Sequence, residues 1–169
     1  MRKLQLLDEV GTDAARFMFL FRSPDTPLDF DLEVAKSRSL ENPVYYVQYA
    51  HARVCALERR AEEKGIILPD ASLPEEIVLL DSPEDMALLR KISFFTEIVA
   101  NSAKMLAPQY ISRYLMELAS RMHAYYGKYT IIDVNNPERT RARLGLLRAA
   151  AQTIANGLEL LGVSAPEIM

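Results

Sequence analysis

Apolar residues at three- and four-residue spacing run through long stretches of this sequence and constrain the fold more than any other feature. In the last such stretch they are Leu144, Leu147, Ala151, Ile154, Leu158 and Leu161. This spacing places the side chains on one face of an α-helix. No pair of alternating apolar and polar segments flanks a hairpin turn, and only 6 of the 169 residues are glycine. The sequence therefore predicts an all-α protein.

Start and stop signals mark the ends of the two clearest helices. Asn136 caps the last helix, Pro137 suits its first position, and Gly162 is a left-handed cap that ends it. Ser82 followed by Pro83 gives the same start signal for a helix that we expect to run to about Leu106.

Three further stretches are predicted to be helical. One covers residues 109–129, another residues 32–64, and a short one starts at Thr12, which we expect to be its cap. Pro43 lacks an amide proton and its ring clashes with the preceding turn, so it should divide the second stretch and leave a separate helix from Tyr45 to Lys64. The segments 23–29 and 65–81 are rich in turn formers and are predicted to be loops.

Four long amphipathic helices predict a helical bundle with a short N-terminal helical segment beside it. We expect residues 1–40 to form a helical connection and residues 41–169 to form the bundle domain. Helical architecture alone does not indicate a function.

Charge is unevenly distributed along the chain. Residues 57–103 carry five Lys and Arg against ten Asp and Glu, a net charge of −5, whereas residues 104–148 carry eight against three, a net charge of +5. A basic zone suits a local contact with a polyanion, although two oppositely charged, solvated helix faces would have the same pattern. Charge alone leaves both interpretations open.

Residues that could carry catalysis or bind a metal are scarce. Cys55 is the single cysteine, which excludes an internal disulfide, and the two histidines, His51 and His123, lie in different predicted helices. No glycine-rich turn enters a helix, so no nucleotide site is predicted. We expect no catalytic residue, metal or cofactor on this chain. No apolar run reaches the roughly 18–20 residues of a membrane span, which predicts a soluble protein.

Tyrosines at helical spacing are the best candidates for a binding surface. Tyr45 and Tyr49 are four residues apart and share a helix face, which Arg53 continues by one turn, while Tyr126 and Tyr129 end a later helix. Single-stranded RNA is bound by stacking bases on aromatic rings while cations hold the phosphates. The competing interpretation is that these rings pack in the core with their hydroxyls at its rim.

A basic face on the last two helices is a second candidate for RNA contact. Its members are Arg139, Arg141, Arg143 and Arg148 on the final helix, and Arg113, Arg121 and Lys128 on the preceding one. They could line a track for an RNA backbone, or they could be a solvated face.

Three segments of the sequence resemble a known family. Residues 6–17 read LLDEVGTDAARF and are followed by SPD at 23–25 and LDFD at 28–31; residues 42–53 read NPVYYVQYAHAR; and residues 155–169 read ANGLELLGVSAPEIM. These segments resemble, in order, the part of arginyl-tRNA synthetases that follows the catalytic signature loop, the first helix of their anticodon domain, and their C-terminus. The sequence departs from that pattern at Gly127, where the family commonly has Asn, and at Ile168, where it commonly has Arg.

The resemblance implies a helical anticodon-binding domain of an enzyme that charges tRNA(Arg). By this resemblance, Tyr49 and Arg53 contact anticodon bases and phosphate, Met169 helps to enclose a base, and Tyr126 and Tyr129 contact the loop. With the aromatic and basic faces above, the predicted RNA-binding residues are Tyr45, Tyr49, Arg53, Tyr126, Tyr129, Arg148 and Met169. ATP and arginine would bind a catalytic domain that is absent from this sequence.

Several expectations about partners follow. The catalytic domain of the same enzyme would be the second partner beside tRNA, in the cytoplasm. If this neighbour is missing, Phe17, Phe19, Leu20 and Phe21 should be partly uncovered, and a mainly monomeric chain could self-associate through them. The alternative function is a separately encoded helical bundle that serves as a protein-interaction scaffold.

Overall fold

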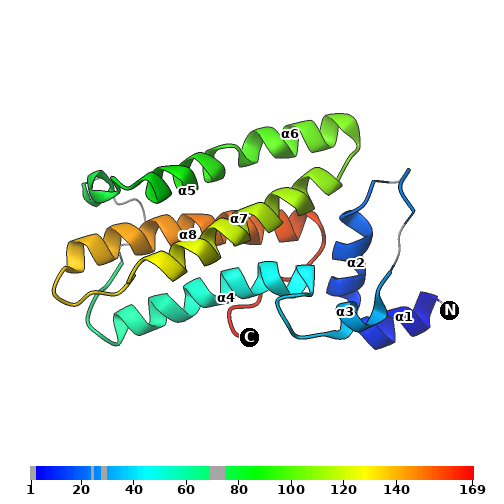
Figure 1. The fold of residues 1–169 in the computed structure, drawn as a ribbon, viewed down its shortest axis with the longest axis horizontal. Coiled ribbons are helices and arrows are strands. Elements are labelled where there is room, and N and C mark those ends of the chain that lie inside the picture. Colours follow the sequence, from blue (N-terminus) through cyan, green and yellow to red (C-terminus); the bar gives the residue numbers. More distant parts are fainter. Residues whose placement is uncertain (1–2, 24, 28–29, 69–74) are drawn as a thin grey trace.

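Every regular element that the structure describes is helical, which confirms the all-α prediction. The computed structural model describes residues 3–23, 25–27, 30–68 and 75–169. Figure 1 shows long, roughly parallel helices with a small group of N-terminal helices at one end. The elements in chain order are α1 (Lys3–Val10), α2 (Thr12–Leu20), α3 (Leu32–Lys36), α4 (Pro43–Glu62), the 3₁₀ turn η1 (Glu76–Leu79), α5 (Pro83–Ser93), α6 (Phe95–Met105), α7 (Gln109–Lys128) and α8 (Pro137–Leu160).

The core lies where α4, α7 and α8 pack on one another. The stripe predicted on α8 is buried as expected: Leu144, Leu147, Ile154 and Leu158 have no exposed surface. Helices α5 and α6 cover α7 and α8 on the side away from α4 (Figure 1). One face of α4 is therefore fixed in the core.

Helix starts follow the predicted capping chemistry. The Asn136 side chain accepts a hydrogen bond from the Arg139 amide at 3.2 Å. Ser82 accepts from the Asp85 amide at 3.1 Å, while the Asp85 carboxylate accepts from the Ser82 amide at 3.0 Å. At the other end of α8, Gly162 has the predicted left-handed conformation, with φ of 66°. These local signals were readable because they need only neighbouring residues.

Pro43 divides the stretch 32–64 as predicted, but it begins α4 instead of preceding it. Asn42 caps the helix: its side-chain oxygen accepts a hydrogen bond from the Val44 backbone amide at 3.2 Å. Its side-chain nitrogen donates to the backbone carbonyls of Ala35 and Ser37. Proline is tolerated in the first turn because its missing amide proton has no intrahelical partner there.

Two other boundaries were predicted wrongly. Thr12 is already helical, and the cap is Gly11, with φ of 81° and no side-chain cap bond. The single helix expected from Ser82 to Leu106 is interrupted at Phe94. The Ser93 hydroxyl donates to the Arg90 carbonyl at 2.8 Å, a side-chain bond of the kind that competes with the helical ladder.

The N-terminal segment is better covered than the sequence suggested. Phe17 has no exposed surface because α2 packs against α4 and α7, so the expectation that it would be uncovered was wrong. Leu20 and Phe21 are half-buried against the core, whereas Phe19 is 53% exposed and pairs with Phe30. The predicted loops 23–29 and 65–81 lie partly outside the described residues; within 75–81 the turn η1 interrupts the loop.

Candidate nucleic-acid interface

The first turns of α4 present an aromatic ladder. The rings of Tyr45 and Tyr49 stack with centroids 6.2 Å apart and planes 7° apart, as their four-residue spacing predicted. His123 of α7 continues the ladder at 5.8 Å from Tyr49. Burial lowers the pKa of His123, so its ring is neutral at neutral pH and adds an aromatic surface rather than a charge.

Arg53 connects this ladder to α7. Its guanidinium lies 4.3 Å from the centroid of the Tyr126 ring, a cation–π contact. The Tyr126 hydroxyl is buried and has no hydrogen-bond partner among the described residues, and burial raises the pKa of this phenol. Arg53 and Tyr126 therefore form a positively charged pair in which only the guanidinium can donate to a ligand, because the Tyr126 hydroxyl is buried.

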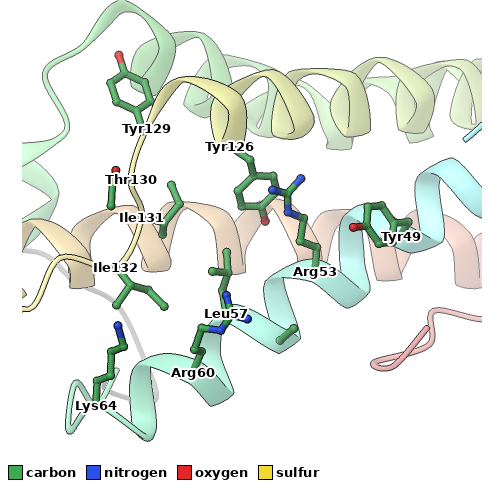
Figure 2. Close-up of a pocket in the computed structure, with 11 residues that line it drawn as sticks. Tyr49, Arg53, Leu57, Arg60, Lys64, Tyr126, Tyr129, Thr130, Ile131 and Ile132 are labelled. Atoms are coloured by element: carbon green, nitrogen blue, oxygen red, sulfur yellow. The ribbon is translucent and has the colours of Figure 1, made fainter.

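A groove runs from this pair along α4, which Figure 2 shows from close by. Its volume is about 470 Å³, and its walls are α4, the end of α7 and the segment 129–132. Its lining residues are Tyr49, Arg53, Ala56, Leu57, Arg60, Lys64, Tyr126, Tyr129, Thr130, Ile131 and Ile132. The lining combines aromatic and aliphatic surface with three cations and no carboxylate, which suits an anionic ligand with flat, partly apolar groups.

Arg60 and Lys64 were missed in the sequence. Both are exposed, and neither forms an ion pair within the part of the chain that the structure describes. In Figure 2 the side chains of Arg60, on α4, and of Lys64, in the turn that follows α4, both point toward the groove. The signal was their spacing, since residues 53, 57, 60 and 64 fall on one helix face.

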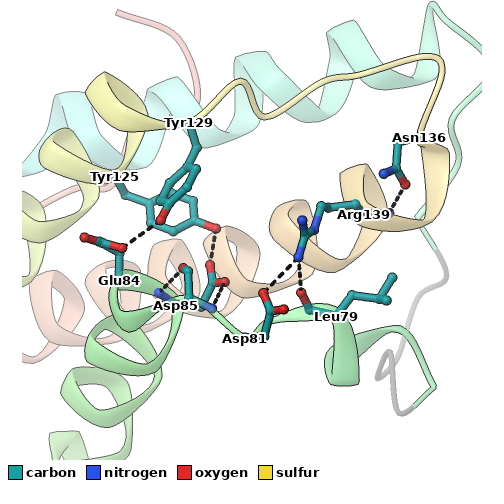
Figure 3. A network of polar contacts seen from close by, with 9 residues as sticks. Leu79, Asp81, Glu84, Asp85, Tyr125, Tyr129, Asn136 and Arg139 are labelled. Carbon is teal, nitrogen blue, oxygen red and sulfur yellow. Dashed lines mark hydrogen bonds and ion pairs between the residues drawn. The ribbon is translucent and has the colours of Figure 1, made fainter.

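Tyr129 forms the rim of the groove and is held firmly. Its hydroxyl donates to Glu84 at 2.7 Å, and the guanidinium of Arg143 lies 4.5 Å from its ring centroid. Lys128 forms an ion pair with the same Glu84. Figure 3 shows the Tyr129 hydroxyl bonded on the α5 side, so the ring supports the groove wall.

The same polar network fixes the segment between α7 and α8. Tyr125 donates to Asp85 at 2.5 Å, and Asp85 is only 2% exposed (Figure 3). Arg139 donates to Asp81 at 2.8 Å and to the Leu79 carbonyl at 3.1 Å. Helix α5 and turn η1 thereby brace the backbone that forms one wall of the groove.

Four of the seven cations of the predicted basic face form ion pairs with acids from residues 57–103. Arg139 pairs with Asp81, Arg141 with Glu76, Lys128 with Glu84, and Arg148 with Glu58 at 2.5 Å between Nε and Oε1. The two oppositely charged segments of the sequence thus contact each other. The cations of the groove, Arg53, Arg60 and Lys64, are a different set from this face.

Met169 does not line the groove. The C-terminal tail, residues 162–169, runs along another side of α4, where the Pro166 carbonyl lies 2.9 Å from His51 and the Glu167 carbonyl accepts from Arg59 at 3.3 Å. Met169 is 46% exposed at its end. The groove and the tail therefore border α4 on two sides, and the predicted residues form a face rather than one pocket.

No group of three His, Cys, Asp or Glu suited to a metal ion occurs within the described ranges. None of the described helices is long and apolar enough to cross a membrane.

Comparison with known proteins identifies the fold. Residues 47–169 match the DALR anticodon binding domain. The chain belongs to this family. The matched DALR domain starts inside α4 and includes α7, α8 and the tail, whereas α1 to α3 precede it.

Two curated arginine–tRNA ligases match nearly the whole chain. An arginine–tRNA ligase of Desulfovibrio desulfuricans is 54% identical over 164 residues, which is 97% of this chain and 30% of that protein. One from Lawsonia intracellularis is 46% identical over 168 residues, again 30% of its length. The solved arginyl-tRNA synthetase of Thermus thermophilus superposes with a TM-score of 0.77 at 31% identity, covering 100% of this chain and 28% of that one. The chain thus spans about 30% of the curated relatives it matches.

The contacts of Glu84 at the groove wall should make the stability of the fold depend on pH in the acid range. Hydrogen bonds from Lys128 and then Tyr129 lower the pKa of Glu84 from its usual 4.5 to about 2. Its contribution to stability is therefore complete above pH 4.5 and is lost as the pH falls toward 2. We expect Glu84→Gln to lower the urea midpoint of unfolding at pH 6. At pH 3 the midpoints of the variant and the unchanged chain should lie closer together, because the unchanged chain has lost part of the Glu84 contribution.

Glu63→Gln is the matched control for this measurement. Glu63 is exposed and has no ion pair in the described portion of the chain, so its removal should leave the midpoint unchanged at both pH values. A Glu84→Gln difference that is equal at pH 6 and pH 3 would contradict the assignment of the pKa shift.

Proposed function

We propose that this chain binds the anticodon loop of tRNA(Arg) as one module of an arginine–tRNA ligase. The observation that carries the proposal is the groove along α4, where stacked tyrosines adjoin three cations without a carboxylate. The family match and the names of the relatives support the same function. ATP and arginine would bind a catalytic domain outside this chain, so the ATP-dependent ligation is assigned to that domain.

The groove suits an RNA loop because it separates two kinds of contact. Tyr45 and Tyr49 offer half-buried rings on which unpaired bases can stack. Arg60 and Lys64, farther along the groove, are placed to hold phosphates. Arg53 lies between them, and its guanidinium edge can donate to a base or a phosphate while its plane remains on Tyr126.

The remaining candidate residues have more limited roles in this proposal. Tyr126 supports Arg53 from below, and Tyr129 forms the rim because its hydroxyl is engaged with Glu84. Arg148 pairs with Glu58, so it would act through the shape of α4 and α8 rather than as the main phosphate contact. If the RNA loop lies across α4, Met169 at the end of the protein tail would help to enclose one of its bases.

The proposal also defines partners and place of action. The catalytic domain of the same ligase is the expected protein partner, and a module that serves protein synthesis would act in the cytoplasm. We expect a monomer. Phe19, the exposed aromatic residue of α2, would be the contact for any self-association.

Removing the Tyr49 ring should abolish selective binding. We expect the chain to bind an arginine tRNA anticodon stem-loop more tightly than one whose middle anticodon base is changed. Because stacking contributes about 1–3 kcal/mol per base, Tyr49→Ala should weaken binding of the arginine loop by that amount. Fluorescence anisotropy titrations at low and physiological salt measure both quantities.

Tyr110→Ala is the control for this titration. Tyr110 is 38% exposed at the start of α7, far along the chain from the groove-lining end of that helix, and should be neutral. Equal binding of both stem-loops, or no binding at low salt, would refute anticodon recognition and favour the scaffold alternative.

The two missed cations should determine part of the salt dependence. If Arg60 and Lys64 each contact a phosphate, replacing both with alanine should make the slope of log affinity against log salt shallower by about 0.7 per contact. The selectivity between the two stem-loops should persist, because phosphate contacts do not identify bases.

Lys104→Ala serves as the charge control. Lys104 is exposed on α6, on the side of α7 away from α4 in Figure 1. A slope that changes equally in Lys104→Ala and in the Arg60 and Lys64 double variant would mean that general charge, not the groove, attracts the RNA.

A further inference from the structure

The C-terminal tail is attached to the N-terminal segment by a specific cluster of hydrogen bonds. One carboxylate oxygen of Asp13, Oδ2, accepts from Gln48 Nε2 at 2.9 Å, from the Ser164 hydroxyl at 2.5 Å and from the Ser164 amide at 3.3 Å. Gln48 also donates to the Ser164 carbonyl at 2.9 Å. Asp13 of α2 thus ties α4 and the tail together, and we name these three residues the Asp13 clasp.

A second contact next to the clasp fixes where the tail turns. Arg16 donates to the Gly162 carbonyl at 3.0 Å. A Cβ atom at Gly162 would lie 2.1 Å from the Arg16 guanidinium, and its φ of 66° disfavours other residues. Both α2 contacts reach the tail from a segment that precedes the region matched to the DALR domain.

Polar contacts hold much of the exposed part of the tail. Val163 is buried, but Ser164, Glu167, Ile168 and Met169 are exposed. Their positions depend on polar contacts to Asp13, Gln48, His51 and Arg59. A tail freed from these contacts would have to be ordered when RNA binds, and fixing each residue costs about 1–2 kcal/mol of conformational entropy.

We propose that Asp13 is a positioning residue for RNA binding: through Ser164 it holds the tail in place before the RNA arrives. This inference rests on the proposed function and extends the binding unit to α2. Asp13 itself need not touch RNA, because it acts through the tail that it holds.

The test compares Asp13→Ala in two backgrounds, the whole chain and a chain that ends at Val163. In the whole chain, loss of bonds to a charged acceptor should weaken stem-loop binding about tenfold. In the shortened chain the substitution should change affinity by less than about twofold, because no tail remains to be positioned. Hydrogen exchange of the backbone amides at 164–169 should accelerate in Asp13→Ala.

Two further variants make the result specific. Asp8→Ala removes an exposed acid of α1 that has no hydrogen bond or ion pair among the described residues, and it should bind like the unchanged chain. Ser164→Ala removes the tail's own hydroxyl and should weaken binding in the same direction as Asp13→Ala, with α2 intact. Circular dichroism melts verify that each variant is folded.

The outcomes separate this inference from the proposed function. Equal losses from Asp13→Ala in both backgrounds, or no loss in the whole chain, would overturn the positioning role while leaving anticodon binding in place. If the unchanged chain fails to prefer the arginine stem-loop, both the proposed function and the positioning role are overturned.

Discussion

The packing of α4 into the core is the constraint on which the other features depend. Val47, Ala50 and Val54 are almost completely buried against α7 and α8, and this fixes the rotation of α4 about its axis. Once that face is fixed, helical geometry turns Tyr49 and Arg53 toward the groove and His51 and Arg59 toward the tail. A change in the rotation of α4 would therefore displace the aromatic ladder, the cations and the tail contacts together.

Charge pairing determines which cations remain available. Glu58 of α4, Glu76 of η1, Glu84 of α5 and Asp81 between η1 and α5 form ion pairs with four cations. The paired cations are Arg148, Arg141, Lys128 and Arg139. The groove keeps Arg53, Arg60 and Lys64 without a carboxylate in its lining. An acidic protein with a net charge of −3 can thus present a local positive surface, and its net charge is a poor guide to its partner.

Features that depend on neighbouring residues could be predicted from the sequence, whereas contacts between distant parts of the chain could not. Asn136, Ser82 and Gly162 cap their helices by contacts within a few residues, so their roles could be read directly. The burial of Phe17 and the pairing of Arg148 with Glu58 depend on how α2, α4, α7 and α8 pack. The stacking of Tyr45 on Tyr49 was predictable from spacing, but its connection through His123 and Tyr126 to α7 was not. The Asp13 clasp joins residues 151 positions apart, so no local sequence pattern predicts it.

The most direct test of the account is to locate the RNA on the protein. An arginine tRNA anticodon stem-loop with 4-thiouridine in its loop can be photo-crosslinked to the chain, and the attachment sites can be mapped by mass spectrometry. The account predicts crosslinks between residues 45 and 64, on α4 and the turn after it, in the segment 126–132 and on the tail. Crosslinks concentrated on α5 and α6, with α4 unlabelled, would contradict it.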